Sequence, residues 1–284
     1  MKIVTAIDSM KGSLSSRQAS EAAAEGIRRA DPAARTEACP VADGGEGTVE
    51  AMTEAMGGHF RTVRVTGPLG DPVECTYGII SEKNTAIIEM AGAAGLPLVP
   101  EELRNPMETT TYGVGQVIRD AIACGCRKLI IGIGGSATND GGAGMLQALG
   151  YQLLDDAGNP IPQKGSGLAR LCRIRTKNRL PELSRCQFLV ACDVTNPLCG
   201  PSGCSAVYGP QKGADPEMVR KMDDWLGRFA ALTAETIPSA DAKAPGAGAA
   251  GGLGFAFASF LGASLEPGIS IVLRETGLEE KIRT

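Results

Sequence analysis

The chain has 284 residues, of which 43% are hydrophobic and 21% are charged, a balance that excludes a wholly disordered protein. Its 28 basic and 32 acidic residues leave a net charge of −4, which argues against a general nucleic-acid binder and against a protein held on an anionic membrane. The length fits one large α/β domain or two smaller domains.

Strands and helices are expected to alternate along the chain. Short apolar runs predict strands at residues 2–7, 37–42, 60–66, 73–80, 85–90, 128–132, 151–154 and 186–192. Apolar periodicity and capping residues predict helices at 16–30, 48–56, 111–124, 140–149 and 215–236. The run at 128–132 is apolar throughout, which is typical of a strand buried on both faces. This order predicts an α/β fold with mostly parallel sheets.

The sequence predicts a cytoplasmic protein that does not enter the membrane. Its nine cysteines are an odd number and no secretory signal precedes them, which indicates free thiols in a reducing compartment. Residues 246–265 carry no charge and are long enough to cross a bilayer. Most of them are glycine or alanine, and no basic cluster or Trp/Tyr anchor flanks them. They therefore predict a glycine-rich loop that runs into a buried helix.

The single histidine limits the chemistry that the chain can perform. A Ser-His-Asp triad, a Cys-His pair or a multi-histidine metal site would each have to use His59. No nucleophile motif lies near His59 in the sequence. We therefore expect any general base to be a carboxylate or a lysine.

Polar residues follow several of the apolar runs at the point where each predicted strand ends. Asp8, Asp43, the segment 134–140 and Asp193 all occupy such places. In open α/β sheets, ligands bind in the crevice at the carboxyl ends of the strands. The alternative is that each residue only caps a helix or forms a turn, which aspartate and asparagine favour. Their repeated placement favours a common binding crevice.

A glycine-rich loop, GIGGSATNDGGAG, begins at Gly132 and joins the buried strand to the next helix. Free backbone N–H groups at such a helix start attract anions, and glycines let a phosphate come close. The loop lacks the Gly-Lys-[Ser/Thr] of a Walker A motif. The spacing of Gly132, Gly134 and Ala137, with Asp155 and Asp156 about 20 residues further on, also matches the dinucleotide-binding fingerprint. An NAD-dependent oxidoreductase is therefore an alternative function.

Other polar side chains favour phosphoryl transfer. Asn139 and Asp140 at the helix start suit a phosphate with bound Mg²⁺ better than a bare pyrophosphate. Asp193 can accept a proton from a substrate hydroxyl or bind magnesium. Lys212, and likewise Lys11, can neutralise charge on a transferred phosphoryl group or on a substrate carboxylate. Phosphoryl transfer needs no histidine or cysteine nucleophile, which agrees with the residues available.

Six segments spread over the chain form a recognisable pattern. They are DSMKGSLSS (8–16), PVADGGEGTVEAM (40–52), VTGPLGDPV (65–73), IIGIGGSATNDGGAGMLQALG (130–150), ACDVTNPLCGPSG (191–203) and GPQKGA (209–214). Together they resemble the bacterial glycerate kinases of the glyoxylate and glucarate utilisation type. The resemblance implies ATP- and Mg²⁺-dependent phosphorylation of D-glycerate, mostly at the 2-hydroxyl, with 2-phosphoglycerate expected rather than 3-phosphoglycerate. The resemblance is also compatible with a homo-oligomer.

The resemblance also implies a domain organisation. It predicts two α/β domains, one of them flavodoxin-like, with the first domain formed by residues 1–62 and 275–284 and the second, residues 63–274, inserted into it. Members of the family continue beyond the segment GLEEKIRT, so the first domain is expected to be incomplete in this chain. A non-catalytic remnant that binds a nucleotide, or nothing, is therefore a further alternative.

Position and chemistry assign a role to each candidate residue. Asp193 is the first choice for the general base, with Asp8 and Asp43 as alternatives. Asp140 or Asp193 is expected to bind Mg²⁺. Contacts to phosphate or substrate are expected from Lys11, Ser13, Gly134, Gly135, Ser136, Thr138, Asn139, Asn196 and Lys212.

Overall fold

The computed structural model describes residues 1–10, 13–42, 45 and 47–283. Its main element is a six-stranded sheet with the strand order β10-β9-β6-β5-β4-β3. The strands are β3 (His59–Thr66), β4 (Pro72–Ile80), β5 (Thr85–Glu89), β6 (Lys128–Gly132), β9 (Gln187–Ala191) and β10 (Ser264–Glu266). The α/β class predicted from the sequence is confirmed.

The main sheet is mixed in strand direction. β5, β6, β9 and β10 run parallel, as predicted. β3 and β4 form an antiparallel hairpin at one edge and β4 is antiparallel to β5, so the sheet is mixed and not wholly parallel. The hairpin closes where the Gly67 N–H donates to the Asp71 carbonyl at 2.7 Å and Gly70 takes φ +98°, a conformation that side chains resist. β7 (Gln152–Leu154) and β8 (Arg173–Arg175) form a separate antiparallel pair.

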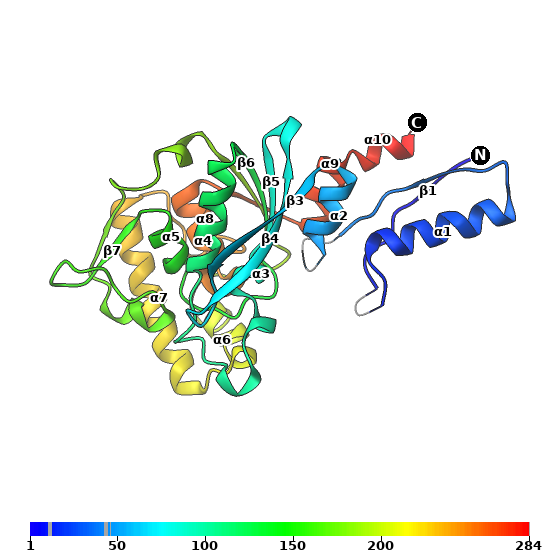
Figure 1. The fold of residues 1–284 in the computed structure, drawn as a ribbon. Helices are drawn as coiled ribbons and strands as arrows, with labels where there is room; N and C mark the ends of the chain where they lie inside the picture. Colours follow the sequence, from blue (N-terminus) through cyan, green and yellow to red (C-terminus); the bar gives the residue numbers. More distant parts are fainter. Residues whose placement is uncertain (11–12, 43–44, 46, 284) are drawn as a thin grey trace.

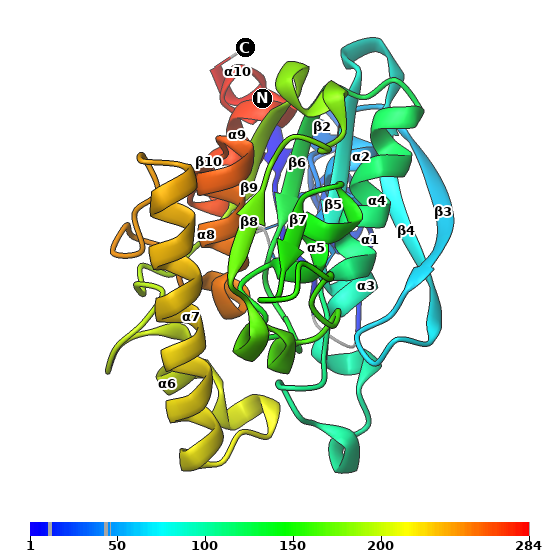
Figure 2. The same cartoon turned by 90° about the vertical axis from the view of Figure 1, so that its left-hand side faces the viewer.

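Helices cover both faces of the main sheet (Figure 2). On one face lie α3 (Ala91–Ala94), α4 (Tyr112–Ala123), α5 (Ala143–Ala148), α7 (Pro216–Thr236) and α8 (Ala249–Leu261), which share the larger hydrophobic core. α2 (Thr48–Ala55) and α9 (Gly268–Thr276) pack on the opposite face around a smaller core. In β6, Leu129 and Ile131 belong to the larger core and Ile130 to the smaller one. Burial of this strand on both faces is thus confirmed.

The N-terminal segment forms a small unit that stands out from the main sheet (Figure 1). β1 (Lys2–Thr5) and β2 (Arg35–Ala38) pair in parallel, and α1 (Ser16–Ala30) packs on them. The helix begins with a capping box, in which the Ser15 and Gln18 side chains each accept the other's backbone N–H. Both strands are shorter than predicted, since β1 ends at Thr5 and β2 at Ala38.

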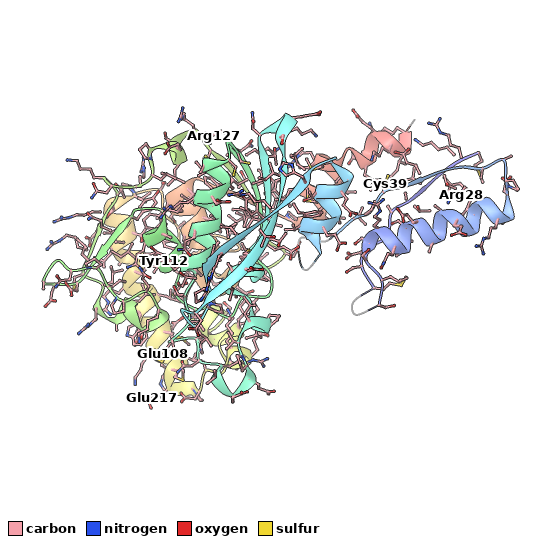
Figure 3. The ribbon with its side chains drawn as sticks, in the orientation of Figure 1. Arg28, Cys39, Glu108, Tyr112, Arg127 and Glu217 are labelled. Carbon is pink, nitrogen blue, oxygen red and sulfur yellow. The ribbon has the colours of Figure 1, made fainter. Side chains whose placement is uncertain are left out.

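Several contacts join the unit to the rest of the chain. After β2 the chain passes Cys39, which is buried in the smaller core (Figure 3). α10 (Leu278–Arg283) returns to the unit, where the Lys2 Nζ donates to the Lys281 carbonyl at 2.6 Å. The predicted division of the chain at residues 62/63 and 274/275 stays a prediction. β3 runs across the first of these boundaries, and α2 packs on β4 and β5.

The glycine- and alanine-rich stretch forms a loop and a buried helix, as predicted. Ala250, Gly251 and Gly252 take left-handed φ values of 51°, 66° and 90° before the regular part of α8 begins. α8 is too short to cross a bilayer, and in the described residues no other helix is both long and apolar enough. All nine cysteines lie in the described part of the chain and are free thiols, which agrees with the prediction of unpaired cysteines.

Candidate functional site

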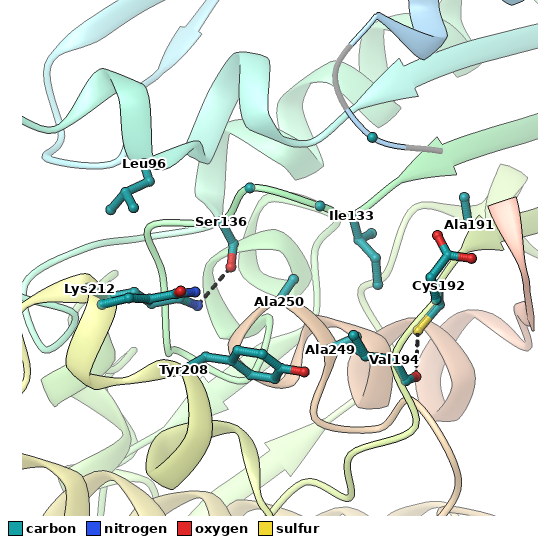
Figure 4. Close-up of a pocket in the computed structure, with 15 residues that line it drawn as sticks. Leu96, Ile133, Ser136, Ala191, Cys192, Val194, Tyr208, Lys212, Ala249 and Ala250 are labelled. Atoms are coloured by element: carbon teal, nitrogen blue, oxygen red, sulfur yellow. Dashed lines mark hydrogen bonds between the residues drawn. The ribbon is translucent and has the colours of Figure 1, made fainter. Parts of the chain in front are cut away.

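A cavity of about 430 Å³ opens at the carboxyl ends of β6 and β9 (Figure 4). Their last residues, Gly132 and Ala191, lie in register, so the segments that follow both strands meet at the cavity. This is the edge of a parallel sheet at which ligands bind in open α/β folds. The walls are formed by Gly45, Leu96, Ile133, Gly134, Gly135, Ser136, Ala191, Cys192, Asp193, Val194, Tyr208, Gln211, Lys212, Ala249 and Ala250.

The predicted glycine loop forms one wall of this cavity. The Gly135 carbonyl accepts the Leu96 N–H at 2.8 Å, which ties the loop to the chain beyond α3. Gly135 has φ +72°, so a side chain would strain the backbone there. Among the described residues, a Cβ on Gly134 would meet only the Cα of Gly45, at 3.8 Å. The loop therefore presents open backbone to the cavity, as a phosphate site requires.

Lys212 lies against this loop, at the end of the short 3₁₀ turn Pro210–Lys212, and is only 2% exposed. Its Nζ donates to the Ser136 Oγ at 2.7 Å and to the Thr138 carbonyl at 2.6 Å. These bonds use two of the three N–H groups of the ammonium, which leaves one for a ligand. Burial lowers the pKa of Lys212 from 10.5 to about 8, because the charged form loses its hydration. The structure thus holds a buried cation at the cavity wall.

Asp193 faces the cavity from the segment that follows β9. Its Oδ1 accepts the N–H of Gly268, the first residue of α9, at 3.0 Å. Its Oδ2 has no protein donor in the described part of the chain. One carboxylate oxygen is therefore anchored at the start of a helix, and the other is available to a substrate proton or a metal ion.

Asp140 is fully buried and does not line the cavity. Its Oδ2 accepts bonds from the Thr111 N–H (2.9 Å), the Thr111 hydroxyl (2.8 Å) and the Gly144 N–H (3.2 Å), and its Oδ1 accepts the Gly142 N–H (3.0 Å). Burial raises the pKa of Asp140, and these donors oppose that effect. The contacts favour a structural role, in which Asp140 joins the starts of α4 and α5.

Three other predicted ligand residues lie behind the cavity wall. Thr138 and Asn139 are almost completely buried, and the Asn139 Nδ2 donates to the Ser205 Oγ at 2.9 Å. The Asn196 Nδ2 donates to the Ser202 carbonyl at 2.8 Å, and its Oδ1 accepts the Tyr208 hydroxyl at 2.6 Å. The structure therefore places these residues as supports of the wall and not among the lining residues.

The remaining predicted residues belong to the N-terminal segments. Asp8 and Ser13 do not line the cavity, and the Asp8 Oδ1 accepts the Ser9 N–H at 2.6 Å. Lys11 and Asp43 lie outside the described residues. Gly45 brings the segment before α2 to the cavity. A Cβ on Gly47 would lie 3.9 Å from the Ser9 Oγ, so the loop after β1 lies beside this segment.

Sequence reasoning missed several residues of the site. Tyr208 and Gln211 line the cavity beside Lys212. Gln211 lies inside the quoted GPQKGA segment but was given no role, and Tyr208 immediately precedes that segment. Glu89 is the last residue of β5 and lies in register with Gly132. Its Oε1 accepts the Val49 N–H at 2.8 Å and so caps α2. The signal that could have identified Glu89 is the one used for Asp193, a carboxylate at a strand end.

The structure does not support the dinucleotide fingerprint. Asp155 and Asp156 follow β7 in the separate two-stranded sheet, and neither lines the cavity. The Asp155 Oδ1 accepts the Asn159 N–H at 2.8 Å and the Asp156 Oδ1 accepts the Ala157 N–H at 2.9 Å. Both carboxylates are therefore turn residues, and the acid that would bind a ribose is not placed beside the glycine loop.

Metal binding by the protein alone is not supported by the described residues. They contain no group of three or more His, Cys, Asp or Glu side chains arranged to hold an ion. Magnesium bound to a nucleotide needs only one or two carboxylates, because phosphate oxygens and water supply the other ligands. Asp193 fits that requirement.

Comparisons with known proteins agree on one family. Residues 3–284 match the model of the glycerate kinase family. The chain is 50% identical over 282 residues to glycerate 2-kinase of Escherichia coli K12 and 48% identical over 281 residues to glycerate kinase of Halalkalibacterium halodurans. Each alignment covers 99% of this chain and 74% of the relative. A crystal structure from Salmonella typhimurium LT2, provisionally named glycerate kinase 2, matches with a TM-score of 0.96 and 51% identity, over 99% of this chain and 76% of that chain.

Proposed function

The chain belongs to the glycerate kinase family, and on that premise we propose that it is a phosphotransferase that moves the γ-phosphoryl group of ATP to D-glycerate. A glycerate hydroxyl attacks the γ-phosphorus, the bond between that phosphorus and the bridging oxygen of ADP breaks, and a base takes the hydroxyl proton. The name of the Escherichia coli relative supports the 2-hydroxyl as the acceptor.

One observation carries the proposal: the buried ammonium of Lys212 and the available carboxylate oxygen of Asp193 line the same cavity as the glycine loop. Phosphoryl transfer is catalysed mainly by positioning and by stabilising the charge that develops on the phosphoryl oxygens. A cation held by two hydrogen bonds needs little reorganisation when that charge appears. An acid–base group on the same cavity supplies the remaining function.

In this proposal the phosphates bind between the glycine loop and Lys212. The backbone N–H groups of Gly134 and Gly135 have no acceptor within the described residues. Together with the third N–H of Lys212 they provide donors for phosphate oxygens. Ser136 completes this wall, because its Oγ already accepts from Lys212 and can still donate its own proton.

Asp193 is the proposed general base, with Asp8 and Asp43 as the alternatives. Asp193 is also the proposed protein ligand of magnesium, because Asp140 is occupied by four hydrogen bonds within the protein. Bound magnesium would neutralise negative charge on the phosphates. Asp193→Asn separates the two roles: loss of the base lowers kcat at every Mg²⁺ concentration, whereas loss of the ligand raises the Mg²⁺ concentration that is required.

The proposal keeps the two α/β domains implied by the resemblance, with the N-terminal unit as part of the first and one domain flavodoxin-like. Gly45, from the segment that follows the N-terminal unit, lines the cavity. This placement supports binding of glycerate between the unit and the main sheet. Asp8 follows β1 of this unit and Asp43 is close to Gly45 in the sequence, which is why they remain alternatives for the base.

The decisive experiment is turnover by the 284-residue chain. ATP, D-glycerate and Mg²⁺ are supplied, ADP release is followed, and phosphorus NMR identifies the product. We expect 2-phosphoglycerate, with kcat at least 100-fold lower in Asp193→Asn and unchanged in Asp224→Asn, which alters an exposed carboxylate on α7. A folded chain that releases no phosphoglycerate would refute the proposed activity and support the non-catalytic alternative.

A further inference from the structure

The cavity has two chemically different walls (Figure 4). The polar wall consists of the glycine loop with Ser136 and Lys212. The other wall is largely apolar and is formed by Val194, Tyr208 and the backbone turn at Ala249 and Ala250. A cavity with one polar and one apolar wall fits a ligand that has a charged part and a flat apolar part.

Tyr208, at the end of α6 (Cys204–Tyr208), is the one aromatic residue among the described residues that line the cavity. Its hydroxyl donates to the Asn196 Oδ1 at 2.6 Å, and the Asn196 Nδ2 donates to the Ser202 carbonyl at 2.8 Å. This chain of two bonds fixes the hydroxyl end of the side chain to the protein. The ring, and not the hydroxyl, therefore remains for the ligand.

Burial raises the pKa of Tyr208, so the hydroxyl stays protonated at neutral pH and keeps its role as donor to Asn196. The hydroxyl bonds to the amide oxygen of Asn196, and the thiols of Cys192 and Cys204 add to the rise in its pKa. The tie between Tyr208 and Asn196 is therefore a neutral hydrogen bond.

The two substrates of the proposed reaction differ in whether they have a flat apolar surface that can pack against the apolar wall. Glycerate is a three-carbon acid with an oxygen on every carbon, so it has no flat apolar surface. The base of a nucleotide has a π-face, and such faces pack favourably on aromatic rings. Resting on the proposed function, we propose that the Tyr208 ring packs against the base of ATP and that Asn196 is a positioning residue that orients the ring.

The test compares a ligand that carries a base with one that does not. Calorimetry measures binding of ADP and of inorganic pyrophosphate to the wild-type chain and to Tyr208→Leu, which removes the ring. We expect ADP to bind about 10- to 100-fold more weakly to the variant, while pyrophosphate affinity stays within about twofold, since the polar wall is intact. Unchanged ADP affinity, or an equal loss for both ligands, would overturn the assignment.

A matched control is Phe60→Leu, which removes an aromatic ring that is 46% exposed on β3, at the far edge of the sheet. Both ligands should bind to this variant as they bind to the wild-type chain. Thermal unfolding of each variant checks that it is folded. A wild-type chain that binds no ADP would also overturn the assignment. A chain that binds ADP through Tyr208 but does not phosphorylate glycerate would refute only the proposed function.

The role of Asn196 has its own readout. Tyr208→Phe and Asn196→Ala each remove the hydrogen bond and keep a ring at position 208. We expect each to raise KM for ATP several-fold with kcat and KM for glycerate nearly unchanged. The double variant should be no worse than Asn196→Ala alone, because Tyr208→Phe removes only a contact that Asn196→Ala already removes. Additive effects, or equal changes in both KM values, would exclude positioning through this bond.

Discussion

From the burial of the Lys212 ammonium we predict that replacing this lysine changes activity and stability in opposite directions. Replacing it with methionine removes a charge that is 2% exposed and keeps a long flexible side chain in its place. The phosphate wall loses its fixed cation, so we expect kcat to fall by at least about 100-fold. Stability is expected to stay the same or to rise at neutral pH.

The expected gain in stability follows from the lowered pKa. A pKa moved from 10.5 to about 8 corresponds to about 3 kcal/mol against folding when the lysine is charged in both states. Lys212→Met removes this cost but leaves the Thr138 carbonyl without its donor, which costs about 1–3 kcal/mol. The variant should therefore be between about 0 and 2 kcal/mol more stable than the wild-type chain at pH 7.

The pH dependence has a definite sign. Above pH 10.5 lysine is neutral in both states and its burial costs no charge, whereas below about pH 8 both states are charged and the cost is complete. Between these values the unfolded chain binds the proton first, so the wild-type chain loses stability as the pH falls. The cost is about 3 kcal/mol at pH 7 and about 1 kcal/mol at pH 9.5. The advantage of Lys212→Met should therefore shrink by about 2 kcal/mol over this range.

Urea unfolding followed by circular dichroism at pH 7 and at pH 9.5 measures this difference. The control is Lys243→Met, which changes an exposed lysine and should shift stability equally at both pH values. Groups that titrate in both chains cancel in the comparison. A Lys212→Met difference that does not change with pH would refute the burial of a charged lysine, and a variant with full activity would refute its catalytic role.

Three further substitutions, with Gly262→Ala as a control for one of them, test the wall and its supports by urea unfolding. Asp140→Ala should lower the unfolding free energy by about 3 kcal/mol or more, because several buried donors lose their acceptor. A loss below about 1 kcal/mol, together with a raised Mg²⁺ requirement for activity, would instead indicate that Asp140 binds magnesium. Ala250→Gly should raise the unfolding free energy by about 0.5 kcal/mol, because relief of the strain of the left-handed backbone at Ala250 exceeds the conformational entropy that the unfolded chain gains. A loss of stability above about 1 kcal/mol would contradict this reasoning. Gly251→Ala should lower the unfolding free energy more than Gly262→Ala does. Both glycines have positive φ, but only an alanine at position 251 would place a Cβ 2.0 Å from the Thr138 carbonyl oxygen. Equal losses of stability would show that neighbouring backbone shifts to relieve this contact.

Local patterns allowed the sheet edge and much of the cavity to be predicted. The apolar run before Gly132 specifies a buried strand because a strand covered on both faces excludes polar side chains. The glycines that follow it indicate backbone open to a ligand, and three of the predicted phosphate contacts, Gly134, Gly135 and Ser136, line the cavity. Asp193 and Lys212 were predicted on the same basis and lie there too. Such features depend on neighbouring residues and can be read without the fold.

The roles of Asp140, Asn196 and Tyr208 could not be predicted in this way. Asp140 was expected to bind magnesium because aspartate after a glycine loop suits that ion, yet its acceptors are used by Thr111, 29 positions earlier, and by its own helix start. Asn196 was expected to touch substrate, but it accepts the hydroxyl of Tyr208. Sequence patterns specify which polar groups are available but not which donors packing brings to them.

By itself the sequence determined the α/β class, the buried strand with its glycine loop, and the family, because these rest on local spacing and on motifs along one chain. Only the tertiary structure decided the burial of Lys212, whose partners Ser136 and Thr138 lie 76 and 74 positions away. It likewise decided that, of the described candidates Asp8, Asp140 and Asp193, Asp193 is the one that lines the cavity. The physical reason is that burial and hydrogen-bond partners depend on the approach of distant segments, and those conditions separate a functional charge from a structural one.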